Sequence, residues 1–208
     1  MKFKNLLFLA LSASILALTS CAKIFYSPDA ETLAQKQRII AVVPPTVSIA
    51  SRKGMDGEAL KEQQKTESLN FQKEIYAWLL KRTMKGKMTQ EIQDIETTNA
   101  KLQQAGYPEK ALTKDQLCQV LGVDGVISSN FGLTKPMSDG AAVALFLVAG
   151  AVGPTNEVNV TLSIHDCPNN KLIWNYNHKF SGGFGSSPSR IVDDLMRHAS
   201  KRMPYMVR

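Results

Sequence analysis

Apolar and polar positions predict a strand and then a long helix in the first half of the chain. Residues 38–43 (RIIAVV) are apolar on both sides, which is typical of a central sheet strand, and the two prolines that follow stop it. After a polar loop, helical periodicity runs from Glu58 to Lys85, and Gly86 ends it. The buried stripe of this helix is predicted to contain Leu69, Ile75, Trp78 and Leu79.

Shorter patterns fill the middle of the chain. Residues 88–95 fit a second strand, and a short helix that Gly106 ends comes after it. Thr113 and Gln116 have the spacing of a capping box, in which each side chain accepts from the other residue's backbone N–H. We therefore predict a helix that begins there and ends at Gly122, followed directly by a strand over residues 123–133.

The clearest pattern is a strand pair near the end of the chain. Apolar positions alternate with polar ones over residues 157–166, and from residue 171 one face carries Leu172, Trp174, Tyr176 and Phe180. Pairing Ile164 with Leu172 and Leu162 with Trp174 would align both apolar faces and leave a five-residue turn.

Together these elements predict a mixed α+β domain. We expect a single mixed sheet of about five strands flanked by about four helices. The C-terminal hairpin is followed by a closing helix from Ser189 to Met203, which Pro204 ends.

The first 21 residues have the pattern of an export signal. The start is positively charged, and residues 5–18 are almost entirely apolar but too short for a stable membrane span. Residues 18–21 (LTSC) resemble the bacterial lipobox, in which a small residue precedes a cysteine. This resemblance implies cleavage after Ser20 and lipidation of Cys21. The alternative is an ordinary signal that happens to contain a cysteine.

Lipidation would attach the protein to a bacterial membrane. Each buried methylene contributes ~0.8 kcal/mol, so three acyl chains make release negligible. Ala22 and Lys23 stand where such lipoproteins often carry an aspartate for inner-membrane retention, so we expect the outer membrane, on its periplasmic side. Residues 21–38 are predicted to be the lipidated N-terminus and a short tether, and residues 39–208 a single periplasmic domain.

Composition limits the classes of partner. Removing residues 1–20 leaves 188 of the 208 residues, enough for one domain with a core. It also removes two lysines, so the formal charge falls from +7 to +5. An exported chain seldom meets nucleic acid, and we expect no nucleic-acid partner. Anionic lipid headgroups or an acidic protein fit the compartment better.

Two cysteines remain beyond Cys21, namely Cys118 and Cys167. In an oxidising compartment they can form a disulfide that closes a loop of about 50 residues, or they can remain buried free thiols. Neither lies in a CxxC motif or at ligand spacing from a histidine, so the sequence predicts no metal site and no cofactor.

The chain carries no pattern that predicts catalysis. His165 and His178 are expected on opposite faces of the hairpin, where they cannot form a dyad, and His198 lies apart on the last helix. The glycine-rich residues 182–190 fit either a flexible turn with an N-cap or an anion cradle. An envelope hydrolase that uses Ser186 with a histidine is the least favoured alternative, because no nucleophile elbow or base is evident.

One segment fits none of these elements. Residues 140–153 (GAAVALFLVAGAVG) are apolar throughout, but as a helix they would span about 21 Å, short of the ~30 Å hydrocarbon core. Three interpretations remain: a small-residue helix buried against the sheet, a contact surface for a partner or sister subunit, and a loop that dips into the membrane. The candidate contact residues are Leu145, Phe146, Leu147 and Val148.

Two short motifs resemble periplasmic lipoproteins related to the curli-secretion channel subunit and the peptidoglycan-synthase activator. Residues 121–126 (LGVDGV) are similar to their helix-Gly-strand entry, and residues 166–174 (DCPNNKLIW) to their Asp-turn-Leu-x-Trp hairpin. The resemblance covers roughly residues 38–203 and implies the mixed α+β fold. The short tether does not fit a synthase activator, and residues 140–153 lack the alternation of a channel strand pair. Neither specific role is therefore carried over.

The sequence thus predicts a membrane-anchored accessory lipoprotein that binds another envelope component and is not an enzyme. The alternative is a self-assembling ring or a subunit associated with a secretion channel, with residues 140–153 as its contact. The expected partners are the membrane, through the acyl chains, and either an envelope protein or further copies of this chain.

Overall fold

The computed structural model describes residues 22–50, 56–134, 156–182 and 187–207. The predictions for Cys21, for the apolar segment 140–153 and for Ser186 fall outside these residues.

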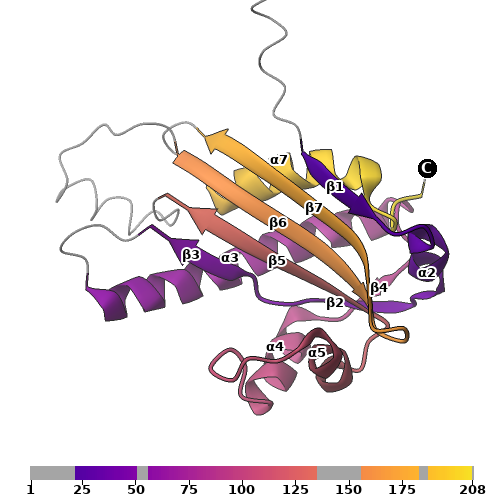
Figure 1. Cartoon of the computed structure of the whole chain (residues 1–208), viewed down its shortest axis with the longest axis horizontal. Coiled ribbons are helices and arrows are strands. Elements are labelled where there is room, and N and C mark those ends of the chain that lie inside the picture. The colour runs from indigo at the N-terminus through magenta and orange to yellow at the C-terminus, as the bar shows by residue number, and fades with distance from the viewer. Residues whose placement is uncertain (1–21, 51–55, 135–155, 183–186, 208) are drawn as a thin grey trace, which may run out of the picture.

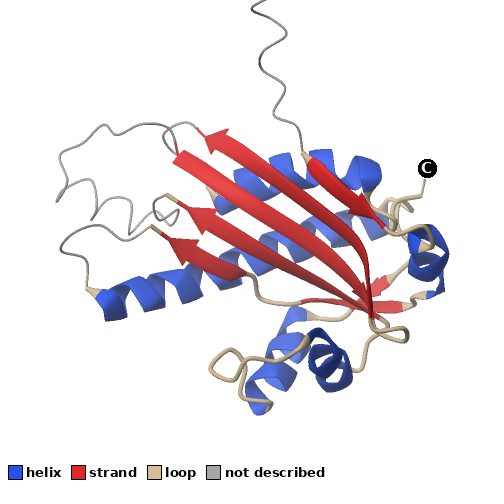
Figure 2. Cartoon of the chain, viewed as in Figure 1, coloured by secondary structure: helices blue, strands red, loops and turns tan. Residues whose placement is uncertain are grey.

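One mixed sheet of seven strands forms the centre of the protein (Figures 1 and 2). Neighbouring strands run antiparallel from β1 to β5, and β2, β3 and β4 join in parallel. In sheet order the strands are β1 (Lys23–Tyr26), β7 (Lys171–Gly182), β6 (Asn156–Asp166), β5 (Gly125–Leu133), β2 (Ile39–Val42) and β4 (Glu91–Ile92), with β3 (Thr46–Ile49) also pairing with β5. The predicted fold class is confirmed, with two more strands than expected.

Helices cover the sheet unevenly (Figure 1). On one face lie α3 and α7, while α4 and α5 lie against the opposite face where β2 and β5 begin. The helices in the described residues are α2 (Ala30–Lys36), α3 (Gly57–Met84), α4 (Ile95–Gln104), α5 (Lys114–Leu121) and α7 (Pro188–Ala199), followed by a short 3-10 turn (Ser200–Arg202).

β2 is apolar on both sides, as predicted, because it separates two clusters of buried residues. Ile40 and Val42 pack into the cluster beneath α3 and α7, whereas Ala41 and Val43 pack beneath α4 and α5. A central strand with both faces covered needs such a continuous apolar run.

α3 begins at an N-cap, Asp56, whose carboxylate accepts from two backbone N–H groups of the first turn. Its buried side includes Phe71, whose ring stacks on Phe131 of β5 with centroids 4.0 Å apart. The prediction that Leu69 is buried is wrong, since its side chain is 44% exposed. Leu69 and Phe71 are two residues apart, about 200° around a helix, so only one of them can face the sheet.

Residues 22–38 do not form the tether that the sequence suggested. β1 pairs with β7 at the edge of the sheet, and α2 buries Ala30 and Ala34 completely. The four residues of β1 are too few, and too exposed, to give a recognisable strand pattern. The folded domain therefore begins at Lys23 instead of residue 39.

The hairpin of β6 and β7 has a different register from the one predicted. Ile164 lies opposite Trp174 and Leu162 opposite Tyr176, and the extra residue Ile173 forms a bulge before Leu172 meets His165. Ile173 and Trp174 are both buried, while Leu172 is 40% exposed. Strict alternation cannot anticipate a bulge, which adds one residue to one strand only.

Candidate functional site

In the part of the chain that the structure describes, no cluster of three or more histidine, cysteine or acidic side chains is placed to hold a metal ion. None of the described helices has the length and apolar character needed to cross a membrane.

One face of the sheet carries a broad polar surface that the described helices leave exposed. The apolar side chains of β3, β5, β6 and β7 point toward α3 and α7, so the alternating polar residues point the other way. We call this surface the polar face. It consists of Thr46, Ser48, Ser128, Asn130, Asn159, Thr161, Ser163, Asn175 and Asn177.

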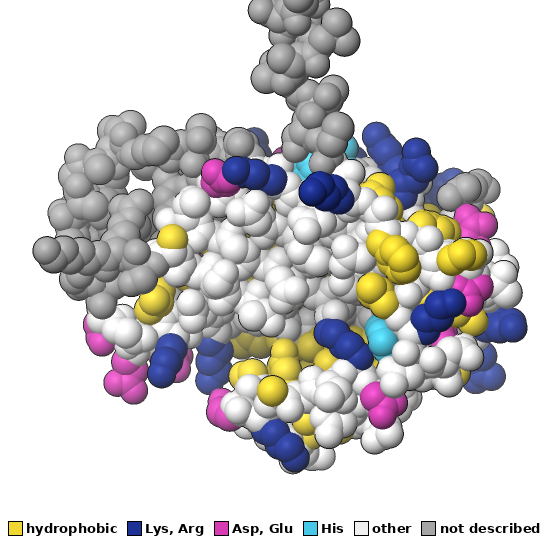
Figure 3. All heavy atoms as spheres, viewed as in Figure 1, with side chains coloured by type: hydrophobic (Ala, Val, Ile, Leu, Met, Phe, Trp, Pro, Cys, Tyr) yellow, Lys and Arg dark blue, Asp and Glu magenta, His cyan; other side chains and the backbone are white. Residues whose placement is uncertain are grey.

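All residues of the polar face are exposed or half-buried, and none of them is charged. Figure 3 shows the same area as a wide stretch free of coloured side chains. The register arranges them in rows across the strands. One row runs through Thr46, Asn130, Thr161 and Asn177. In the next row, Asn175 Nδ2 donates to Ser163 Oγ at 2.8 Å.

Apolar and charged groups lie only at the margins of the polar face. Phe25 of β1 lies opposite Asn175 and is 49% exposed. Lys23 lies opposite Asn177, and Lys179 forms an ion pair with Glu157. The alternation within β6 is visible in the sequence, but this surface is not, because its extent depends on the order of the strands.

The structure brings together two histidines that sequence reasoning kept apart. The rings of His178 and His198 are nearly parallel, with centroids 6.3 Å apart. In the hairpin, His178 lies opposite Val160. Burial, and secondarily the charge of His198, lower the pKa of His178. Among the described residues, the buried Nδ1 of His178 has no hydrogen-bond partner.

His165 makes a separate, local contact. Its Nε2 lies 2.9 Å from Asn170 Oδ1 within the turn between β6 and β7, and its side chain is largely buried. In the register of the hairpin His165 lies opposite Leu172, five positions along β6 from Val160, the partner of His178. His165 is therefore part of the turn's structure.

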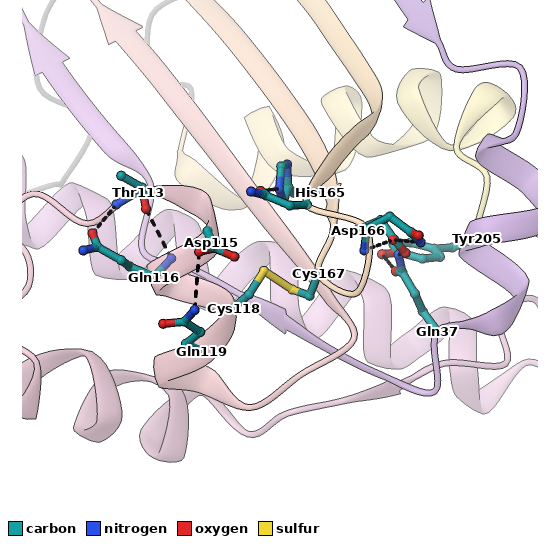
Figure 4. The surroundings of a disulfide bond; sticks show 12 residues. Gln37, Thr113, Asp115, Gln116, Cys118, Gln119, His165, Asp166, Cys167 and Tyr205 are labelled. Carbon is teal, nitrogen blue, oxygen red and sulfur yellow. Dashed lines mark hydrogen bonds between the residues drawn. A yellow bond between two sulfur atoms is a disulfide. The ribbon is translucent and has the colours of Figure 1, made fainter.

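Cys118 and Cys167 are joined in a disulfide (Figure 4). The bond links α5 to the turn between β6 and β7, with 5.5 Å between the two Cα atoms. α5 itself begins at the capping box that the sequence predicted, since Thr113 Oγ1 accepts from Gln116 N while Gln116 Oε1 accepts from Thr113 N.

The LGVDGV motif lies beside a buried polar network. Asp124 accepts backbone N–H bonds from Arg38 and Ile39 at the start of β2. Beside it, Gln37 donates to Asp166 at 2.7 Å, and the Tyr205 hydroxyl donates to Gln37 (Figure 4). Burial, with the nearby charges of Asp166 and Asp124, raises the pKa of Tyr205. Asp124 of the motif therefore has a structural role at the start of β2.

Comparison with known proteins gives structural likeness only. No family model and no curated protein matches the chain. It is similar to lipoprotein GNA1162 from Neisseria meningitidis (15% identity over 79% of this chain and 94% of that one, TM-score 0.46). It is also similar to the PelC dodecamer from Paraburkholderia phytofirmans (12% identity, 90% and 98% covered, TM-score 0.37) and to the LpoB C-terminal domain from Salmonella enterica (10% identity, 73% and 95% covered, TM-score 0.35). Similarity at these values does not transfer a function.

Proposed function

We propose that this protein is an accessory lipoprotein of the bacterial envelope that binds another envelope component and catalyses no reaction. Acyl chains on Cys21 would anchor it, in the outer membrane and facing the periplasm. The observation that supports this proposal most is the position of β1, whose first residue, Lys23, follows Cys21 by two residues.

This spacing determines how the domain would be held. Two residues extend at most about 7 Å, so acyl chains on Cys21 would keep the edge of the sheet at the headgroup layer. The exposed residues of β1 suit that position. Lys23 offers a positive charge, and Ile24 and Phe25, 41% and 49% exposed, offer apolar surface.

The anchor is tested by labelling cells with a palmitate analogue. The wild-type chain is expected to incorporate the label and to sediment with envelopes, and Cys21→Ala to be unlabelled and unprocessed. The control is the double variant Cys118→Ser/Cys167→Ser, which retains Cys21 and should be labelled. An unlabelled wild type, or a labelled Cys21→Ala, contradicts the anchor.

The close attachment is tested with a photo-crosslinking residue at position 25. With the natural spacing between Cys21 and β1, we expect this residue to crosslink to lipid. When a flexible linker of about 20 residues is inserted after Ala22, the crosslinks should be lost. The same probe at exposed Lys73 of α3 is the control. Equal lipid crosslinking with and without the linker contradicts close attachment.

Binding of an envelope component is tested by in-cell crosslinking from two places. The polar face is one, with the probe at Asn159. The apolar residues Leu145, Phe146, Leu147 and Val148 are the other, as the contact that the sequence nominates. A specific adduct from either place supports the accessory role, and adducts from neither contradict it.

A further inference from the structure

The composition of the polar face is not what sheet stability alone favours. Asparagine is depleted in strands because it packs poorly on a pleated surface. The polar face nevertheless has four asparagines on three adjacent strands, namely Asn130, Asn159, Asn175 and Asn177. The charged residues on the same side of these strands, Lys23, Glu157 and Lys179, lie at its margins, and its middle carries amides and hydroxyls.

The side chains of the polar face define the chemistry of a ligand. Carboxamides and hydroxyls both donate and accept hydrogen bonds. They match a ligand whose own groups do the same, such as the hydroxyl and acetamido groups of a sugar. The middle of the face carries no charge and gives no attraction to nucleic acid, an acidic peptide or an anionic headgroup.

Apolar contact is available at one end of the same surface. Phe25 lies directly opposite Asn175 and is half exposed, and Leu172 of β7 is 40% exposed nearby in the sheet. Figure 3 shows exposed hydrophobic side chains beside the uncoloured area. An exposed aromatic ring beside amide groups suits the C–H face of a sugar ring, which is apolar, while the amides bind its rim.

The dimensions suit a polymer. The row from Thr46 to Asn177 crosses four strands and continues to Lys23 on β1. At about 4.8 Å per strand it is about 19 Å long, enough for several linked sugar rings. Gly132, between Ser48 and Asn159 in the register, leaves the adjacent row of the surface low.

We propose that the polar face binds the N-acetylated glycan strands of the cell wall. This inference rests on the proposed envelope location. It deepens the proposed function by naming the component bound. It also places the glycan strand beside the membrane, because Lys23 at the end of the row follows Cys21 by two residues.

The first experiment measures co-sedimentation of the full-length, detergent-solubilised protein with purified peptidoglycan sacculi. Asn130→Ala/Asn177→Ala should weaken binding about tenfold, because each lost hydrogen bond lowers the affinity severalfold. The matched control is Gln103→Ala/Gln104→Ala, which removes two exposed amides from α4 and should bind like wild type. Equal binding by both double variants overturns the proposal.

A second variant separates binding from folding. Gly132→Val adds a side chain that favours strands, and a Cβ there would meet its nearest neighbours at an ordinary 3.7 Å. We expect unchanged or higher thermal stability together with weaker binding to sacculi. Undiminished binding by Gly132→Val contradicts a glycan chain that lies across the face beside Gly132.

Soluble probes test the chemistry of the ligand. Chitohexaose should shift the amide resonances of the polar face, and cellohexaose, which lacks acetamido groups, should bind several times more weakly. Equal affinities overturn the N-acetyl specificity, and binding of neither sugar nor sacculi overturns the inference altogether. If the asparagine variants change only the oligomeric state, the occupant is a second copy and the proposal is wrong.

The outcome is independent of the anchor. Cys21→Ala leaves the polar face unchanged and should bind sacculi as well as wild type does. Palmitate labelling without glycan binding would reject this inference and leave the anchor in place. Glycan binding without palmitate labelling would support this inference and reject the anchor.

Discussion

Gly125 occupies a point where three distant parts of the chain meet. A Cβ at this residue would lie 2.1 Å from Gln37 Oε1 and 2.7 Å from the Tyr205 hydroxyl. Both side chains belong to the buried network that includes Asp166, so neither can move away without losing hydrogen bonds. Hydrogen is therefore the only side chain that fits.

Gly125→Ala should consequently lower the free energy of unfolding by about 1–3 kcal/mol, the cost of disrupted buried hydrogen bonds. Urea denaturation followed by circular dichroism measures the change. Gly132→Ala is the matched control on the same strand, since its Cβ would make only ordinary contacts at 3.7 Å. Identical unfolding midpoints for the two variants would refute the role given to Gly125.

The lowered pKa of His178 should make the stability of the fold depend on pH. Because burial and His198 lower its pKa below the ordinary 6.5, the folded protein takes up this proton at lower pH than the unfolded chain does. Just below pH 6.5 the unfolded state binds more protons, so stability falls as the pH falls through that window and is fully present above it. The melting temperature should therefore fall less for His178→Gln than for wild type between about pH 7.5 and about pH 5.5, a range that brackets this window. Thermal melts at the two pH values measure the difference. A loss of the same size in both proteins would be evidence against this assignment.

At the scale of elements, the sequence predicts best where local signals and long patterns coincide. The capping box at Thr113 defines the start of α5, and the continuous apolar run 39–43 marks β2 as central. β1, β3 and α2 were missed because each has only four to seven residues, and tertiary pairing decides their structure. The bulge at Ile173 likewise has no signal in a period-two pattern.

The candidate site shows the same division. The alternation in β6 gave the orientation of Asn159, Thr161 and Ser163, but joining them with Asn130 and Asn177 requires the strand order β7-β6-β5. The contact between His178 and His198 requires the packing of α7 on β7. No local pattern in the sequence contains either relation.

The disulfide between α5 and the turn after β6 should contribute strongly to stability. It joins residues 49 positions apart, and closing a loop of that length lowers the entropy of the unfolded chain by an amount worth about 4 kcal/mol. Cys118→Ser/Cys167→Ser should therefore unfold at a lower urea concentration. Reductant should bring wild type to the same midpoint and leave the variant unchanged. A wild type insensitive to reductant in the unfolding transition would contradict this expectation.

At the scale of the whole molecule, residues 22–37 belong to the fold. Deleting them would remove an edge strand, expose the surface that Ala30 and Ala34 cover, and take Gln37 away from Asp166. We expect a chain that begins at Arg38 to melt at a markedly lower temperature, or without a cooperative transition, in calorimetry. A chain that begins at Ala22 is the control and should melt like the full-length protein. Equal melting of both truncated chains would restore the interpretation of this segment as a tether.

The position of β1 in the sheet also fixes an order of events during synthesis. Lys23 pairs with Asn177, which lies 177 − 23 = 154 residues later in the chain. The first strand to be made is therefore unable to pair until β7 has been made, and so many intervening residues make this closure slow. Until then residues 23–26 have no partner in the sheet, so the lipidation proposed for Cys21 would meet a chain segment not yet docked on the domain.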